Sequence, residues 1–225
     1  MRNLRERLAE VNRRIRTAEQ AAGRELGSVT LLAVGKTQPA RRLALAYRWG
    51  QRHFAESYLQ EAIDKQALLA NYDITWHFIG PVQSNKTKSI AARFAWIHSV
   101  DRLKIAQRLS EQRPVHLPPL NVCLQVNVSG ETTKTGVSLD ELPNLAVEVE
   151  NLPRLQLRGV MAIPAPSECY EEQRSPYRTL REAATALNLT SFDTYSFGMS
   201  EDLEAAVAEG ATMVRVGTAI FGSRN

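Results

Sequence analysis

The chain has 225 residues, of which 44% are hydrophobic and 23% are charged, and its formal net charge is +4. This composition is that of a globular protein that can bury a sizeable core, and the small net charge excludes a strongly basic nucleic-acid-binding domain. No apolar run approaches the roughly 18 residues that a membrane-spanning helix needs, so we expect no such span.

The first segment, residues 3–22, has the pattern of an amphipathic helix. Its apolar positions recur at helical spacing, with Arg and Glu on the opposite face: Leu4, Leu8, Val11, Ile15 and Ala18. Such a helix could lie on a membrane surface or pack on a protein domain. We favour packing, because the apolar face carries no Trp or Phe. We therefore expect residues 1–26 to form an N-terminal helix packed on a domain that spans residues 27–225.

After Gly27, short apolar runs alternate with helical patterns. The predicted strands are residues 29–35, 52–57, 75–80, 95–100, 120–128, 155–163, 193–198 and 212–217. The predicted helices between them are residues 39–49, 57–70, 84–93, 101–113, 138–150, 168–188 and 201–209. Strand and helix alternation with short loops indicates right-handed βαβ units and a parallel sheet.

Eight strands predict a single (β/α)8 barrel, the TIM barrel, in the α/β class. The rival is an open doubly wound sheet, which normally carries a Gly-rich fingerprint after its first strand. The segment here, "GKTQPA", has a single Gly and a Pro and does not match that fingerprint. We therefore predict the barrel, without a linker or a repeat that would divide it.

Active residues of such a barrel project from the carboxyl ends of the strands and from the loops that follow. Because successive side chains of a strand alternate between its faces, Lys36 shares a face with Val34. In the last strand Arg215 shares a face with Met213. If these faces form the lumen, a lysine and an arginine both point into one barrel mouth.

Two inward-pointing cations repel each other, and burial adds to the cost. The arrangement becomes favourable if Lys36 forms an imine with an aldehyde, since a nearby Arg helps to lower the pKa of the amine. Two other interpretations stay open: Lys36 is a solvated residue at a strand end, or Arg215 forms a salt bridge with an acid of the barrel.

The loops after the seventh and eighth strands are the usual phosphate site of this fold. They read "GMSED" and "GTAIFG". We expect Ser200 to begin a helix and to offer its hydroxyl and the following amides to an anion. Gly217 permits close backbone approach, and Thr218 adds a hydroxyl and an amide. Glu201 and Asp202 would repel a phosphate unless their side chains point away. Lysine, arginine and a phosphate cradle together indicate pyridoxal 5′-phosphate (PLP).

Several long motifs resemble one family, in the order in which that family has them. They are "LLAVGKTQPA", "HFAESYLQEA", "WHFIGPVQSNKTK", "IHSVDRLKIAQRL", "CLQVNVSGETTKTGV", "LRGVMAIP" and "FGMSEDLEAAVAEGATMVRVGTAIFG". The family is that of the pyridoxal phosphate homeostasis proteins, single-domain relatives of the N-terminal barrel of alanine racemase. The resemblance runs from about residue 29 to the end of the chain.

The resemblance implies a role for each matching residue. Lys36 would be the imine lysine, and Arg215 would face the pyridine nitrogen. The phosphate would be held by Ser200, Gly217, Thr218 and the Met199 backbone. Ser57 stands where the family usually has Asn, so a water could replace its direct contact with the cofactor. Gly35 stands where the family often has Ser, and we expect it to loosen the backbone beside Lys36.

The resemblance further implies a PLP-binding protein that holds the cofactor as a lysine Schiff base and contributes to vitamin B6 and amino-acid balance without efficient catalysis. One alternative is a weak PLP-dependent racemase or lyase with His77 as its acid; another is a Schiff-base aldolase. We expect a cytoplasmic monomer that passes PLP to PLP-dependent apoenzymes and binds no nucleic acid, membrane or metal. Its two cysteines form no CxxC pair, which favours a reducing compartment.

Overall fold

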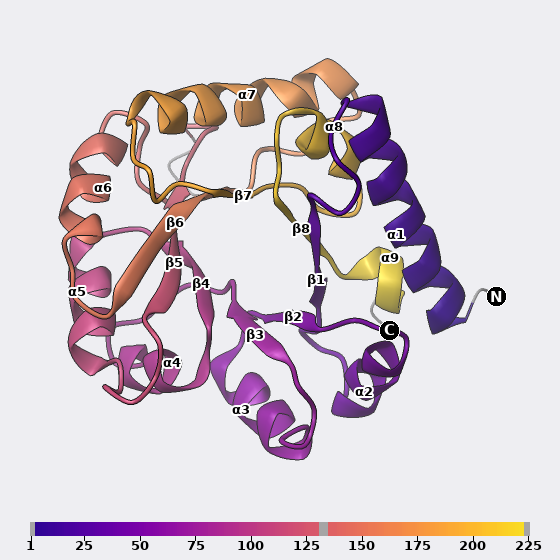
Figure 1. The fold of residues 1–225 in the computed structure, drawn as a ribbon, viewed down its shortest axis with the longest axis horizontal. Coiled ribbons are helices and arrows are strands. Elements are labelled where there is room, and N and C mark those ends of the chain that lie inside the picture. The colour runs from indigo at the N-terminus through magenta and orange to yellow at the C-terminus, as the bar shows by residue number, and fades with distance from the viewer. Residues whose placement is uncertain (1–2, 131–134, 223–225) are drawn as a thin grey trace.

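The protein is described by a computed structural model that covers residues 3–130 and 135–222. Its centre is a closed barrel of eight parallel strands that follow one another in chain order (Figure 1). The strands are β1 (Thr30–Val34), β2 (His53–Glu56), β3 (Thr75–Phe78), β4 (Trp96–Val100), β5 (Leu120–Val126), β6 (Leu155–Ala162), β7 (Thr194–Ser196) and β8 (Met213–Val216). The predicted (β/α)8 barrel is confirmed.

Helices surround the strands in Figure 1. They are α1 (Leu4–Ala21), α2 (Ala40–Arg48), α3 (Leu59–Leu68), α4 (Thr87–Arg93), α5 (Leu103–Gln112), α6 (Leu142–Glu150), α7 (Tyr170–Ala186), α8 (Leu203–Ala208) and α9 (Thr218–Phe221). Helix α9 was expected to be a loop. It has a single turn, which is too short to show a helical period in the sequence. None of the helices in the described ranges is long and apolar enough to cross a membrane.

The barrel closes where β8 pairs in parallel with β1. In this register Leu32 lies opposite Arg215, and Thr30 lies opposite Met213. The first and last strands are therefore neighbours in the barrel, although they lie at opposite ends of the chain. The closure brings the loop that carries Lys36 next to the end of β8.

The barrel has an inner and an outer apolar core. The inner cluster fills the lumen with two side chains from β1 and one each from β2, β4, β5, β6 and β8, as strand alternation predicts: Leu32, Val34, Ala55, Trp96, Cys123, Met161 and Met213. The outer cluster lies between the strands and the helices. Cys123 is fully buried as expected, and this burial raises the pKa of its thiol to about 12. The apolar lumen therefore disfavours the charged forms of side chains that are buried in it.

Helix α1 begins at a capping box in which Asn3 and Glu6 each bond the backbone of the other. It lies against α8 and α9 and buries its apolar face there. A bidentate Arg14–Glu204 pair, with both N–O distances 2.7 Å, joins it to α8. The buried Glu19 carboxylate accepts the amides of the loop before β1, at 2.8 Å from Val29 N. The helix is therefore tied to the start of the first strand.

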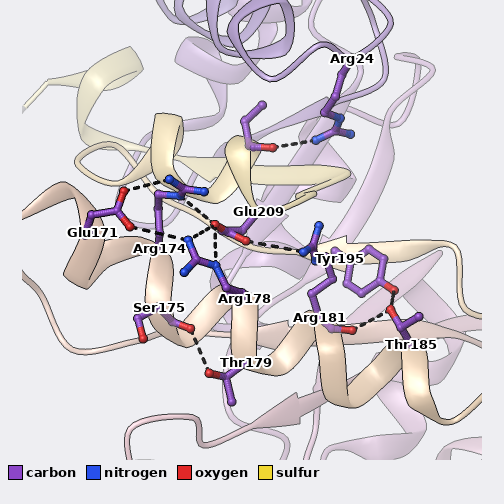
Figure 2. A network of polar contacts seen from close by, with 11 residues as sticks. Arg24, Glu171, Arg174, Ser175, Arg178, Thr179, Arg181, Thr185, Tyr195 and Glu209 are labelled. Carbon is purple, nitrogen blue, oxygen red and sulfur yellow. Dashed lines mark hydrogen bonds and ion pairs between the residues drawn. The ribbon is translucent and has the colours of Figure 1, made fainter.

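Helices α7 and α8 are joined by an ionic network around Glu209 (Figure 2). Glu209 is buried, and its Oε1 accepts from Arg174 Nε at 2.7 Å and from Arg178 Nη2 at 2.9 Å. Burial alone would raise the pKa of Glu209, but the hydrogen bonds from Arg178 and Arg174 outweigh it and lower that pKa. The network fixes α8, and the loop before α8 is one of the two predicted phosphate loops.

Candidate functional site

A cavity of about 590 Å³ opens at the carboxyl ends of the strands. It is lined by Val34 of β1, Arg215 of β8 and residues of the loops that follow β1, β2, β3, β6, β7 and β8, together with Gln173 of α7. All seven residues that the sequence analysis selected are in its lining: Lys36, Ser57, Met199, Ser200, Arg215, Gly217 and Thr218. The structure therefore brings together side chains that the sequence spreads over most of its length.

Lys36 lies in the turn that follows β1. Leu32 and Val34 belong to the inner cluster. Because side chains alternate between the two faces of a strand, Lys36 lies on the same side and lines the cavity. Its side chain is half-buried. Gly35 extends the ladder by donating its N–H to Ala55 O at 2.9 Å. The predicted orientation of Lys36 toward the barrel mouth agrees with this geometry.

Arg215 lies at the floor of the cavity and is only 4% exposed. Its guanidinium donates to Ser196 O, to Ser196 Oγ at 2.8 Å and to Ala162 O at 2.8 Å. No carboxylate in the described part of the chain forms an ion pair with it, so the salt-bridge interpretation is wrong. Burial lowers the pKa of Arg215 from its ordinary value. A buried guanidinium held by neutral acceptors is well suited to meet an acceptor or an anion in the cavity.

Below Arg215, three histidines form a hydrogen-bonded row through the lumen. His53 Nδ1 lies 3.1 Å from His77 Nε2, His77 Nδ1 lies 2.9 Å from His98 Nε2, and His98 Nδ1 lies 2.9 Å from Ser196 Oγ. Burial, reinforced by the positive charge of Arg215, lowers the pKa of His98 to about 3. Burial also lowers the pKa of His77 far below its ordinary value. The inner histidines are therefore neutral.

The histidine row changes the role expected of His77. Both of its ring nitrogens face other imidazoles, and the residue is fully buried below the cavity rather than in its lining. His77 is thus a core residue, and the racemase or lyase alternative loses the acid that the sequence suggested for it. No group of His, Cys, Asp or Glu suited to hold a metal ion occurs in the ranges that the structure describes.

The loop after β7 is organised by Asp202, a residue that the sequence analysis considered only as a source of repulsion. Asp202 Oδ1 accepts from Met199 N at 2.6 Å, and Oδ2 accepts from Tyr177 Oη–H at 2.6 Å. The Tyr177 hydroxyl in turn accepts from Gly198 N at 3.2 Å. The Asp202 charge is thus held by two donors, while the Met199 amide is occupied by this carboxylate.

The sequence analysis expected Ser200 to begin a helix, and this prediction is wrong. Helix α8 begins at Leu203, and Ser200 lies in the turn before it. The reason is that Asp202 is the residue preceding the helix, and its side chain turns back to the loop. The Ser200 hydroxyl instead accepts from Ala219 N at 3.5 Å, which links the loops after β7 and β8.

Gly217 and Thr218 form the other side of the cavity. A Cβ at position 217 would lie 3.3 Å from Val34 O, so the glycine permits β8 to pass close to the end of β1. Thr218 is exposed and is the first residue of α9. The two loops therefore offer hydroxyls and amides on the side of the cavity next to the strand that leads to Lys36.

The cavity also has a wall that the sequence analysis missed. Residues 163–167, which follow β6, line it together with Gln173. Gln173 Nε2 donates to Ser167 O at 2.7 Å, which joins this segment to α7. The signal that could have indicated a rigid wall is the "IPAPS" segment, because prolines restrict the backbone.

Comparison with known proteins agrees with this geometry. The family model described as "Alanine racemase, N-terminal domain" matches residues 7–225. A pyridoxal phosphate homeostasis protein of Pseudomonas aeruginosa is 59% identical, with 100% of this chain and 97% of that protein covered. The protein of the same name from Escherichia coli K12 is 49% identical, with coverages of 100% and 98%.

A solved structure extends this comparison. The chain is similar to PipY of Synechococcus elongatus, whose structure is described as having PLP bound. The TM-score is 0.84 at 36% identity, and the match covers 98% of this chain and 100% of PipY. The fold and the site define a barrel of the alanine racemase N-terminal class. Within that class, the chain belongs to the pyridoxal phosphate homeostasis protein family, as its motifs predicted.

Proposed function

We propose that this protein binds pyridoxal 5′-phosphate in the cavity at the carboxyl ends of the strands and holds it as a Schiff base on Lys36. The observation that carries the proposal is the buried Arg215 guanidinium in the same cavity as Lys36, with the Ser200 and Thr218 hydroxyls on one side. When bound, PLP supplies an aldehyde that condenses with a primary amine and releases one water molecule. The donor set fits such a ligand, because it combines an amine, a guanidinium and neutral anion-binding groups.

Each residue of the site has a separate task in this proposal. Ser200, Gly217 and Thr218 would hold the phosphate, and Arg215 would donate to the pyridine nitrogen. Ser57 lines the cavity and would contact the ring through a water that extends its short side chain. The Met199 amide takes part only when Asp202 releases it, because the two are bonded at 2.6 Å. Arg215 cannot give up its proton, so it keeps a hydrogen-bonded ring nitrogen unprotonated.

The biological role we propose is that of a carrier in vitamin B6 and amino-acid balance, without efficient catalysis. The names of the relatives support the homeostasis role. The position of His77 below the cavity supports the absence of efficient turnover, since His77 was the acid that the racemase alternative needed. We propose further that the protein acts as a cytoplasmic monomer and passes PLP to PLP-dependent apoenzymes. Sedimentation of the purified protein tests the monomer, and PLP transfer to an apoenzyme tests the recipient.

The central experiment locates the bound cofactor. Purified protein incubated with PLP should show a visible absorption band, and borohydride reduction followed by peptide mass mapping should find the label on Lys36. Lys36→Ala should abolish both. The control is Lys88→Ala, which removes an exposed lysine of α4 and should leave both unchanged. A label that stays on the protein in Lys36→Ala would refute the proposal.

A further inference from the structure

A second lysine is buried behind the turn that carries Lys36. Lys65 of α3 is 4% exposed, and its ammonium group has three acceptors. Nζ donates to Gly35 O at 2.6 Å, to Glu56 Oε1 at 2.8 Å and to Glu61 Oε1 at 2.6 Å. An ammonium group has three N–H donors, so these three acceptors satisfy it fully.

The same cluster bonds the peptide groups on both sides of Lys36. Gly35 O, which precedes Lys36, accepts from Lys65. The N–H of Thr37, which follows Lys36, donates to Glu61 Oε1 at 2.6 Å. Thr37 has a φ of 63°, a left-handed conformation that is unfavourable for a β-branched residue. The cluster therefore holds the Lys36 backbone in a turn that the local sequence does not favour.

Glu56 completes the cluster from the end of β2. It is fully buried, and its Oε2 atom has no hydrogen-bond partner in the described part of the chain. A Cβ at position 35 would lie 2.5 Å from Glu56 Oε1, so the carboxylate packs directly against Gly35. The Gly35 N–H donates to Ala55 O, and the Gly35 C=O accepts from Lys65. The sequence analysis expected Gly35 to loosen the backbone beside Lys36, but these two hydrogen bonds hold it in place.

Buried ion pairs are weak sources of stability, because desolvation of the charges offsets most of their attraction. Replacing such a pair by apolar side chains of similar volume is often neutral or stabilising. Apolar side chains, however, could not donate the hydrogen bond that Lys65 Nζ gives to Gly35 O. The position of the charges, against the backbone on either side of Lys36, thus points to a role in the site.

We propose that Lys65 is a positioning residue for Lys36, acting with Glu56 and Glu61 as a charged clamp on residues 35–37. This inference rests on the proposed function, since it assigns a purpose to the position of the imine-forming amine. Lys65 is not itself the imine lysine, because its three donors are bonded and it does not line the cavity.

The test separates positioning from folding by comparing two ligands. PLP can form the imine, whereas pyridoxine 5′-phosphate has the same ring and phosphate but no aldehyde. The first variant is Lys65→Met combined with Glu56→Gln, which removes the two buried members of the cluster together, while the Glu61 carboxylate keeps the Thr37 N–H as its donor. The second is Glu61→Ala, and its control is Asp64→Ala. Asp64 is an exposed acid on the same helix, and its carboxylate accepts from Gln60 at 3.1 Å.

The clamp predicts a selective loss. In both variants the affinity for PLP should fall by about tenfold or more, while that for pyridoxine 5′-phosphate stays within about twofold of wild type. The yield of borohydride-trapped PLP on Lys36 should fall with it. Asp64→Ala should behave as wild type in every measurement.

Other outcomes overturn the inference. Equal losses for both ligands would mean that the cluster supports the whole cavity, and no loss for either would mean that it does not position Lys36. If the variants trap PLP on Lys36 as well as wild type does, the inference alone fails. If wild type itself does not trap PLP on Lys36, the proposed function fails, and the inference fails with it.

Discussion

Tyr177→Phe removes one hydroxyl group from behind the loop that follows β7. Tyr177 is fully buried, and its ring stacks on Phe197 with the centroids 5.0 Å apart, a contact that Phe would keep. The hydroxyl donates to Asp202 Oδ2 at 2.6 Å and accepts from Gly198 N at 3.2 Å. The substitution therefore tests these two hydrogen bonds with little change in packing.

The magnitude follows from what each partner can do afterwards. The Gly198 amide is buried, so it loses its acceptor without access to water, which costs about 1–3 kcal/mol. Asp202 is half-exposed, and water can replace the lost donor at small cost. We expect a loss of about 2 kcal/mol in the free energy of unfolding, which lowers Tm by about 4–8 °C in a domain of this size.

Urea and thermal unfolding measure this change. The control is Tyr195→Phe, because the one hydrogen bond of the Tyr195 hydroxyl within residues 3–130 and 135–222 is an exposed contact of 3.4 Å with Thr185 Oγ1. The control should stay within about 0.5 kcal/mol of wild type. If Tyr177→Phe also stays within that range, the hydroxyl does not support the loop, and our account of Asp202 as its organiser is wrong.

Three further predictions concern the site and the barrel. Ser200→Ala and Thr218→Ala should each weaken retention of PLP by about 1–3 kcal/mol, as measured by equilibrium dialysis, and unchanged affinity in both would place the phosphate elsewhere. Burial raises the pKa of Glu56 from 4.5 to about 7, outweighing the opposing effect of Lys65. The folded protein therefore keeps a proton that the unfolded chain has released. The free energy of unfolding should therefore fall as the pH rises from 4.5 to about 7, by up to about 1.4 kcal/mol per pH unit. Glu56→Gln should remove this pH dependence from urea unfolding curves. A slope that persists in the variant would assign it to another group. Gly159→Ala would place a Cβ 1.8 Å from Thr194 O, so it should prevent the pairing of β6 with β7 and yield little folded protein by circular dichroism; a folded variant would contradict this.

The sequence by itself determined the barrel and the principal residues of the cavity. Alternating apolar runs predicted the eight strands, because strand and helix periods are local properties of the chain. Strand alternation placed Lys36 and Arg215 toward the lumen. The two loops after the seventh and eighth strands indicated Ser200, Gly217 and Thr218, and the family motifs added Ser57 and Met199. It did not find α9, and it misplaced the start of α8 at Ser200, since a one-turn helix and a side chain that folds back on its own loop leave no periodic signal.

Only the tertiary structure decided what surrounds those residues. His98 meets Ser196 across 98 positions of the chain, and Lys65 meets Gly35 across 30. Such contacts depend on how the barrel closes and on its register, which no local pattern encodes. The sequence could therefore predict that an amine and a guanidinium share one cavity. That neutral histidines lie below Arg215, and that a buried ion cluster holds the turn of Lys36, follows from the packing of helices and strands that are distant in the chain.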